Sequence, residues 1–383
     1  MQRGDVVTLR IDRLSYNGGR GVGRYEGVVV FVPETAPNEF VEVKITAVKK
    51  NFAEAELIKI LEPSPSRRMP PCPVAGVCGG CSWQHIVYPE QLRQKEAILR
   101  HALARALREK GGEHSQYGLT IRPAPSEFRY RNRIQIHVEG ARFGFYAKRS
   151  RELVSIEDCL IAESALLENF APIISQGSLE VSFDEQGRRQ IRELDERGPS
   201  FAQVNTRQNE ELRATVVNYV ERIGQGLRRV LDIYCGDGNL SFPVIEKFQS
   251  LHLTGVELSK STVRRAQDTA NKSGFADRVE FIAGDAQAYL KKLSSSEVDA
   301  SVMILDPPRA GLGRDTISEI SRWASHGLLG VVLISCDLGS FERDAGLLRE
   351  HFSLVDVTGI DMFPQTEYIE IVSLFLSRAA QKP

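Results

Sequence analysis

Hydrophobic and polar residues alternate along the first sixty positions of the chain. In EFVEVKITAV (39–48) the apolar side chains of Val41, Val43 and Ile45 fall on one face, which is the period of a half-buried strand. EGVVVFVPE (26–34) is a second strand, entered through the glycine-rich YNGGRGVGRY (16–25). A dinucleotide-binding glycine loop opens a helix, whereas a strand follows here, so hairpin glycines are the better interpretation. Short alternating strands with such turns predict a small β-barrel.

The pattern changes twice further along the chain. Proline-rich LEPSPSRRMPPCP (61–73) predicts a linker, and EQLRQKEAILRHALARALREKG (90–111) has the apolar period of a helix. From about residue 205, apolar strands alternate with helices, which predicts an α/β domain with an open, largely parallel Rossmann-like sheet and helices on both faces. The last two strands have no helix between them and should pair antiparallel. We therefore expect three domains: an OB-like barrel at 1–62, an α+β domain at 63–204 and the Rossmann-like domain at 205–383.

Composition and charge narrow the class of protein. The 383 residues are 42% hydrophobic and 26% charged, as in ordinary globular proteins. With a net charge of −1, the protein could bind nucleic acid only through a local basic face. The N-terminus lacks the apolar stretch of a signal peptide, and the longest apolar runs are too short to span a bilayer. We expect a cytoplasmic monomer without a membrane partner. In that compartment the six cysteines are metal ligands or catalytic groups more often than disulfides.

Acidic residues follow successive strands of the predicted sheet. VLDIYCGDGNLS (230–241) is a strand and a glycine turn, which lets a backbone approach a ligand closely. Glu257 ends the second strand, where a carboxylate accepts hydrogen bonds from ribose hydroxyls, and Asp285 follows the third, near an adenine amino group. The pattern fits a dinucleotide or S-adenosylmethionine. A complete G-x-G-x-x-G is absent, and D-x-x-C-G-x-G-N resembles the first motif of methyltransferases.

Two further strands end in groups that suit chemistry beside such a cofactor. The fourth runs into DPPR (306–309), whose prolines place the Asp306 carboxylate in the crevice, while Arg309 argues against the D-P-P-Y motif of amino-group methylation. The fifth, VVLISCD (331–337), ends at Cys336. A cysteine there can be core packing, a metal ligand or a nucleophile. Because the carboxyl ends of neighbouring strands face one crevice, we expect Cys336 and Asp306 near the methyl donor.

A thiolate beside a methyl donor suits methylation of uracil at C5. C5 is a poor nucleophile, but addition of a thiolate to C6 gives an enolate whose charge reaches C5, which can then take a methyl group. A base must afterwards remove the C5 proton so that the thiolate is expelled. FPQTEYIEIV (363–372) offers Glu367 and Glu370 for this step.

The segments DIYCGDGNLS, DPPRAGLG, ISCD and FPQTEYIE together resemble the S-adenosylmethionine-dependent RNA (uracil-5-)-methyltransferases, and most closely the branch that modifies 23S ribosomal RNA. This resemblance implies that Cys336 is the nucleophile and that Glu370, not Glu367, accepts the C5 proton. The family usually has His where Tyr368 stands. Cys235 has no base assigned to it and is expected to be structural. The resemblance also implies contacts to the cofactor or the target base from Gln203 (in SFAQVN), Tyr234, Asn239, Glu257, Asp285 and Asp306.

Three cysteines form a compact group in CPVAGVCGGCSWQ (72–84), and a fourth lies far downstream. Four thiolates can hold zinc or a [4Fe–4S] cluster, and a triplet with a remote fourth ligand favours iron–sulfur, because zinc sites usually come as two close pairs. The resemblance implies a [4Fe–4S] cluster on Cys72, Cys78, Cys81 and Cys159. We favour a structural or RNA-ordering role for it over redox sensing.

Several features predict RNA as the partner, most of all 23S rRNA. The barrel resembles a TRAM domain, an RNA-binding module. RYRNR (129–133) and FGFYAKRSR (143–151) interleave cations with aromatic rings, as surfaces that bind phosphates and stack bases do; the alternative is a solvated strand face. Two other functions stay open: a tRNA uracil-5-methyltransferase, and a non-catalytic iron–sulfur protein that binds RNA or senses redox state. Intact Cys336 and Glu370 count against the latter.

Overall fold

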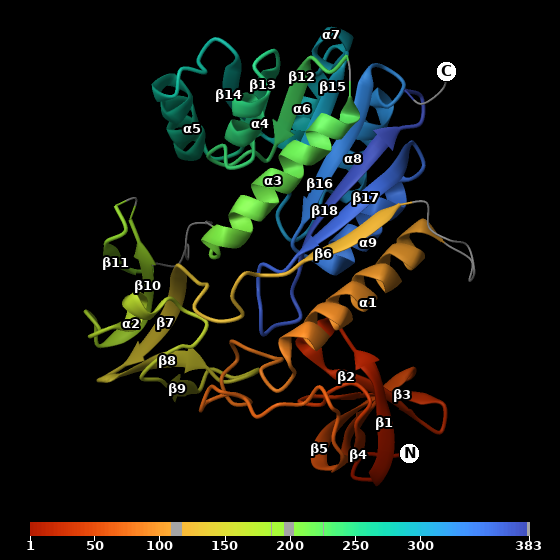
Figure 1. Cartoon of the computed structure of the whole chain (residues 1–383), viewed down its shortest axis with the longest axis vertical. Helices are drawn as coiled ribbons and strands as arrows, with labels where there is room; N and C mark the ends of the chain where they lie inside the picture. The colour runs from red at the N-terminus through yellow and green to blue at the C-terminus, as the bar shows by residue number, and fades with distance from the viewer. Residues whose placement is uncertain (109–116, 185, 195–202, 225, 381–383) are drawn as a thin grey trace. The chain divides into compact units, whose positions relative to one another are not determined.

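The computed structural model describes residues 1–108, 117–184, 186–194, 203–224 and 226–380. The chain divides into two compact units, whose helices and strands are labelled in Figure 1. The first unit comprises residues 1–98, 123–209 and 362–368, and the second comprises 99–122, 210–361 and 369–383. The three domain boundaries expected from the sequence stay a prediction. Within the described ranges, every helix is too short or too polar to cross a bilayer.

The N-terminal strands close into a barrel, which confirms the prediction from their alternation. The strand order is β1-β2-β3-β5-β4 (Figure 1), with bounds β1 Val6–Leu14, β2 Gly21–Tyr25, β3 Val28–Val32, β4 Phe40–Val48 and β5 Phe52–Glu62. Val41, Val43 and Ile45 all point into the barrel core. The glycine-rich segment enters β2, where a Cβ added to Gly23 would meet the Arg10 carbonyl oxygen at 2.3 Å. Close strand packing therefore explains this glycine.

A second, antiparallel sheet completes the first unit. Its order is β11-β10-β7-β8-β9, with bounds β7 Arg133–Glu139, β8 Arg142–Tyr146, β9 Leu153–Ser155, β10 Gln176–Phe183 and β11 Arg189–Glu193. Ile134, Ile136 and Val138 of β7 share a core with β10 and with the short helix α2 (Ser164–Leu167). The alternation of β7 thus buries one face of this sheet.

The second unit is built on an eight-stranded sheet. Its order is β14-β13-β12-β15-β16-β18-β17-β6 (Figure 1), with bounds β6 Gly118–Arg122, β12 Arg229–Ile233, β13 His252–Glu257, β14 Val279–Ala283, β15 Ser301–Leu305, β16 Leu328–Ser335, β17 Phe352–Ile360 and β18 Glu370–Ser377. The first five strands of that order are parallel. β18 is antiparallel to both its neighbours; its pairing with β17 was predicted, and its pairing with β16 was not. The sequence analysis missed β6, which pairs with β17 from far upstream in the chain.

Helices connect the strands of this sheet and pack on it. α5 packs on β13 and β14, α4 on β13 and α9 on β16. The helix bounds are α1 Tyr88–Leu107, α3 Thr206–Ile223, α4 Ser241–Lys247, α5 Lys260–Lys272, α6 Ala286–Lys292, α7 Ser295–Val298, α8 Gly313–Trp323 and α9 Leu338–Leu348. The strand order reverses direction at β12, and in such sheets ligands bind at the carboxyl ends of the strands beside that point.

Candidate active site

The turn after β12 is shaped for close approach of a ligand. Tyr234 has a left-handed φ of 69°, and the turn continues through Gly236 and Gly238 to Asn239. Gly238 has φ 92°, and a Cβ there would meet the Phe242 ring at 2.4 Å. Only glycine fits this position, so the turn is tight and its backbone lies unshielded by a side chain at Gly238.

A buried carboxyl group lies beneath this turn. Asp232 is fully buried, and its Oδ2 accepts a hydrogen bond of 2.5 Å from Ser241 Oγ of α4. Burial raises the pKa of Asp232 to about 7, and the charge of Asp306 adds to this. Its Oδ1 has no hydrogen-bond partner among the described residues. The sequence analysis assigned no role to Asp232, although it is the first residue of the D-x-x-C-G pattern.

Glu257 and Asp285 lie at the ends of the next two strands. Glu257 is the last residue of β13, and its carboxylate accepts a hydrogen bond of 2.9 Å from the Ser259 backbone. Asp285 caps α6, because its Oδ1 accepts a hydrogen bond of 2.8 Å from the backbone N–H of Ala288. Leu258 is an apolar side chain left 73% exposed directly after Glu257. These groups and the glycine turn follow three adjacent strands, as the sequence predicted.

Cys336 and Glu370 are brought together by strand pairing. β16 and β18 are antiparallel, and Ser335 pairs with Ile371. The next position outward therefore sets Cys336 opposite Glu370. Asp306 follows β15, which is the other neighbour of β16. The structure thus gathers three predicted site residues at one edge of the sheet.

The electrostatics of this group favour protonated side chains in the free protein. The pKa of the Cys336 thiol is raised to about 11, chiefly by burial and then by Glu370, while Arg309 acts in the opposite direction. The pKa of Glu370 lies well above its usual range because the carboxyl group is buried, and Asp306 adds to this. Burial also raises the pKa of Asp306 to about 7. Arg309, which the sequence analysis used only against amino-group methylation, is therefore the cation that favours ionised Cys336 and Glu370.

The loop after Arg309 is held by α9. Asp344 is almost fully buried, and its Oδ2 accepts a hydrogen bond of 2.7 Å from Leu312 N. Arg343 donates a hydrogen bond of 2.7 Å to the Ala310 carbonyl. Between these contacts, Gly311 has φ 77°, and a Cβ there would meet Asp344 Oδ2 at 2.3 Å. The chain next to Arg309 is thus fixed by two adjacent residues of α9.

Gly311→Ala should therefore lower the melting temperature more than Gly274→Ala. Gly274 has a similar φ of 75° but nothing within 4 Å of an added Cβ, so its substitution costs only the left-handed conformation, about 1–2 kcal/mol. Gly311→Ala adds a clash with a buried carboxylate, worth about 1–3 kcal/mol more. We expect melting temperatures at least about 2 °C apart. Equal melting temperatures would show that the loop yields without cost.

Cys235, Gln203 and Glu367 are the remaining residues that the sequence singled out near the site motifs. Cys235 is buried, and its Sγ would be 2.9 Å from a Cβ added to Gly255 of β13, so it packs between two strands. Gln203 belongs to the first unit, and residues 200–202 of its SFAQVN motif lie outside the described residues. Glu367 also belongs to the first unit, where its Oε2 accepts a hydrogen bond of 2.6 Å from Ser82 Oγ. The Glu367 carboxylate is thus engaged in a hydrogen bond within the first unit.

The four predicted cysteine ligands line one cavity of the first unit. The cavity has a volume of about 170 Å³, and its other walls include Gln84, Arg131 and Phe145; the cysteines are Cys72, Cys78, Cys81 and Cys159. Among the described residues, no three His, Cys, Asp or Glu side chains are arranged to hold a metal ion. The four cysteines nevertheless share the lining of one cavity.

The walls of this cavity are both apolar and cationic. Burial raises the pKa of Cys81 to about 12 and raises those of Cys78 and Cys159. The Arg131 guanidinium lies near the Cys81 and Cys159 thiols, and its Nε has no hydrogen-bond partner in the described part of the chain. Such thiols stay protonated at neutral pH unless a metal binds them, so the cavity is suited to a metal-containing group that takes thiolate ligands.

The arginine-rich segment RYRNR does not form the open surface that its sequence suggests. Arg131 faces the cysteine cavity, and Tyr130 is buried, with its hydroxyl donating to the Pro364 carbonyl at 3.1 Å. Arg129 is ion-paired with Asp158. The prediction that these side chains stack bases and bind phosphates is wrong for Tyr130 and Arg131, because both are used inside the first unit.

A glycine turn and acidic strand ends on this Rossmann-like sheet are the arrangement expected of a site for an adenosine-containing cofactor such as S-adenosylmethionine. The model of the family described as tRNA (Uracil-5-)-methyltransferase matches residues 173–379, and that of the TRAM domain matches residues 1–58. The chain belongs to the RNA (uracil-5-)-methyltransferase family. The fold class and enzyme class expected from the sequence are thereby confirmed.

Relatives agree with this assignment, and a solved structure shares the fold. An uncharacterized RNA methyltransferase of Bdellovibrio bacteriovorus is 37% identical over 97% of this chain and 95% of its own length. The 23S rRNA (uracil(1939)-C(5))-methyltransferase RlmD of a Marinomonas species is 27% identical over 97% of this chain and 95% of its own length. The crystal structure of Pyrococcus abyssi tRNA (uracil-54, C5)-methyltransferase with S-adenosyl-L-homocysteine has a TM-score of 0.70, with 20% identity, and the match covers 96% of this chain and 99% of the other. That structure shares the fold along nearly the whole chain.

Proposed function

We propose that this enzyme methylates C5 of a uridine in 23S rRNA through a covalent intermediate on Cys336. The observation that carries the proposal is the strand pairing that sets Cys336 opposite Glu370, beside Asp306 and Arg309. A nucleophile and a general base held at one edge are the two groups that C5 methylation requires. The similarity to the Marinomonas enzyme and the TRAM domain support 23S rRNA as the substrate.

The residues divide the reaction into three steps. Cys336 Sγ bonds to C6 of the uracil, and the electron pair of the C5–C6 double bond moves to C5 and O4. C5 then takes the methyl group from the sulfonium of S-adenosylmethionine. Glu370 removes the C5 proton, the double bond forms again, and the C6–S bond breaks to release the thiolate. The Arg309 charge favours the ionised forms of both groups that these steps need.

The groups along the sheet edge supply the methyl-donor site in this proposal. Glu257 is suited to the ribose hydroxyls and Asp285 to the adenine, since each ends its strand beside the glycine turn. The proposed cofactor contacts also include Tyr234 and Asn239, which follow β12, and Asp306, which follows β15. The resemblance to the family motif SFAQVN adds Gln203. In this division, residues 1–62 bind RNA, 63–204 hold the cysteine site and 205–383 carry the methyltransferase site.

We also propose that Cys72, Cys78, Cys81 and Cys159 hold a [4Fe–4S] cluster. The four cysteines line one cavity of about 170 Å³, and four thiolates are the ligand set that such a cluster takes. Arg131 offsets negative charge at the site. When bound, the cluster ties the 72–81 segment to Cys159 by iron–thiolate bonds, and we assign it a structural role.

Protein purified without oxygen should be brown and contain about four irons per chain. Cys159→Ser should lose this iron as fully as Cys81→Ser, because each removes one of the four ligands. Cys235→Ser is the matched control and should keep it, since Cys235 lies in the core of the other unit. Metal analysis that finds zinc and no iron in anaerobic wild-type protein would contradict the cluster.

The substrate is tested with unmodified transcripts of 23S rRNA and tRNA. After incubation with S-adenosylmethionine, each RNA is digested to nucleosides, and 5-methyluridine is measured by mass spectrometry. We expect 5-methyluridine in the 23S transcript and none in the tRNA. Product in the tRNA alone would make this a tRNA enzyme, the activity named for the Pyrococcus abyssi structure.

A further inference from the structure

We propose that Gln365 is a positioning residue for Glu370, and that it fixes the 363–368 loop on the cysteine-bearing segment. This inference rests on the proposed function, because it assigns a residue to the step in which Glu370 removes the C5 proton. Gln365 lies in the FPQTEYIE motif, but the sequence analysis assigned it no role. Its burial, its contacts and its place in the chain point to one.

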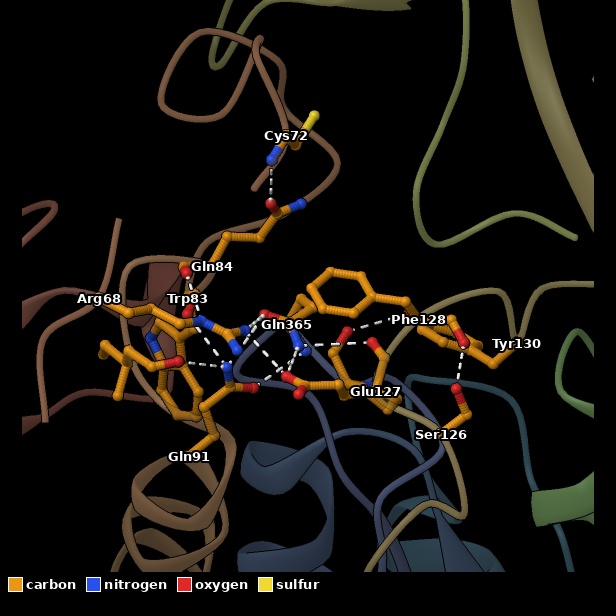
Figure 2. A network of polar contacts seen from close by, with 12 residues as sticks. Arg68, Cys72, Trp83, Gln84, Gln91, Ser126, Glu127, Phe128, Tyr130 and Gln365 are labelled. Carbon is orange, nitrogen blue, oxygen red and sulfur yellow. Dashed lines mark hydrogen bonds and ion pairs between the residues drawn. The ribbon is translucent and has the colours of Figure 1, made fainter. Parts of the chain in front are cut away.

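Every polar atom of Gln365 is used, although the residue is fully buried. Figure 2 shows it at the centre of a network of polar contacts. Its side-chain Oε1 accepts from Arg68 at 2.9 Å and from Gln91 at 3.0 Å, and its Nε2 donates to Glu127 Oε2 at 2.9 Å. Its backbone N–H donates to Gln91 Oε1 at 3.0 Å. Its carbonyl accepts from the backbone N–H of Ser82 and Trp83, both at 3.0 Å.

The same contacts reach the segment that carries three cysteines. Arg68 donates to the Gln84 carbonyl at 2.9 Å, and Gln84 Oε1 accepts from the Cys72 backbone at 3.2 Å (Figure 2). Ser82 directly follows Cys81. The loop that contains Gln365 is therefore attached to both ends of the 72–81 segment, within the first unit alone.

The backbone of Gln365 depends on these contacts. Its φ is 70°, a left-handed conformation that costs a residue with a side chain about 1–2 kcal/mol. Buried polar contacts on every side hold it there. Two residues later, Glu367 is anchored in turn by Ser82 Oγ at 2.6 Å.

The covalent chain links this anchored loop to the base. Glu370 begins β18 three residues after Glu367, a span of at most about 11 Å of chain. If the loop loosens at Gln365, the chain that leads into β18 loses its anchor on that side. The Glu370 carboxylate is then held less firmly in place. Cys336 follows β16, whereas the 363–368 loop leads into β18. Loosening this loop should therefore affect addition to C6 and methyl transfer far less than proton removal.

Gln365→Glu tests this role with almost no change of shape. The substitution replaces the Nε2 donor by a carboxylate oxygen. This oxygen faces the Glu127 carboxylate at about hydrogen-bond distance, so two negative charges repel each other. Adding Glu127→Gln restores a donor–acceptor pair in the reverse direction and keeps the net charge of the wild type. Gln176→Glu, at an exposed position of the same unit, is the matched control.

The readout separates two steps on uridine RNA with labelled S-adenosylmethionine. Methyl transfer is the total label on RNA, and proton removal is the release of labelled RNA from the slow-migrating covalent complex on a denaturing gel. For Gln365→Glu we expect methyl transfer within about twofold of wild type and release slowed about tenfold, as for a slightly misplaced catalytic group. The double variant should recover most of the release rate, and Gln176→Glu should match wild type.

Arg68→Ala provides a second change at the same anchor, because it removes the hydrogen bond that Arg68 donates to Gln365 Oε1, and should slow release about threefold without slowing methyl transfer. It decides the matter if Gln365→Glu lacks a cooperative melting transition. Equal slowing of both steps, or release at the wild-type rate, overturns the role of Gln365. If the wild-type protein itself forms no 5-methyluridine, it is the proposed function that fails.

Discussion

Replacing Cys336 by alanine should abolish methylation of uridine RNA, with a loss of at least ~10³-fold, because no other described group faces Glu370 with a nucleophilic sulfur. The same variant should form no covalent complex with RNA that contains 5-fluorouridine. Fluorine at C5 cannot leave as a cation, so the wild-type complex stalls after methyl transfer and survives denaturation. A gel with labelled RNA measures both effects.

Cys235→Ala is the control for this experiment. Cys235 is buried between β12 and β13, and burial raises the pKa of its thiol, so it should not act as a nucleophile. We expect this variant to keep its covalent complex with 5-fluorouridine RNA. A complex of equal yield with Cys336→Ala would place the nucleophile at another residue.

Glu370→Gln should accumulate a methylated covalent complex on ordinary uridine RNA. Addition to C6 and methyl transfer precede the step that needs the base, so both should proceed while release slows by ~10²-fold or more. Glutamine fills the same buried space, which keeps the packing of β18 intact. The measurement is a denaturing gel with RNA and labelled S-adenosylmethionine.

Glu367→Gln is the matched control at the other glutamate of the motif. A glutamine there can still accept the hydrogen bond from Ser82, so turnover should stay close to wild type. A slow-migrating labelled band for Glu367→Gln and none for Glu370→Gln would show that the two glutamates have been assigned in the wrong order.

The period of the apolar residues was enough to predict most of the fold. Alternation at Val41, Val43 and Ile45 identified a barrel strand, because a strand with one buried face imposes that period. The missing helix between β17 and β18 predicted their antiparallel pairing. The edge strand β6 could not be found in this way, since it pairs with β17 across more than a hundred residues of chain.

The candidate site, like the fold, could be predicted from the sequence only in part. The motifs and the family resemblance pointed to Cys336, Glu370 and the four cysteines, but their proximity depends on strand register and on a shared cavity. Arg131 shows the limit of charge patterns: a cation between aromatic residues suggests a surface, yet it faces the cysteine cavity. Gln365 stands within the FPQTEYIE motif, but the motif does not show its role, because that role comes from contacts with three distant segments.

The central claim, methylation at C5 of uridine, is tested most directly by RNA labelled with tritium at C5. Each methyl group that reaches C5 must displace one C5 hydrogen, which Glu370 passes to solvent. We predict that the enzyme, given S-adenosylmethionine and 23S rRNA transcript, releases one tritium to water for every methyl group transferred to RNA. Methyl transfer without tritium release would place the methyl group on another atom and contradict the account.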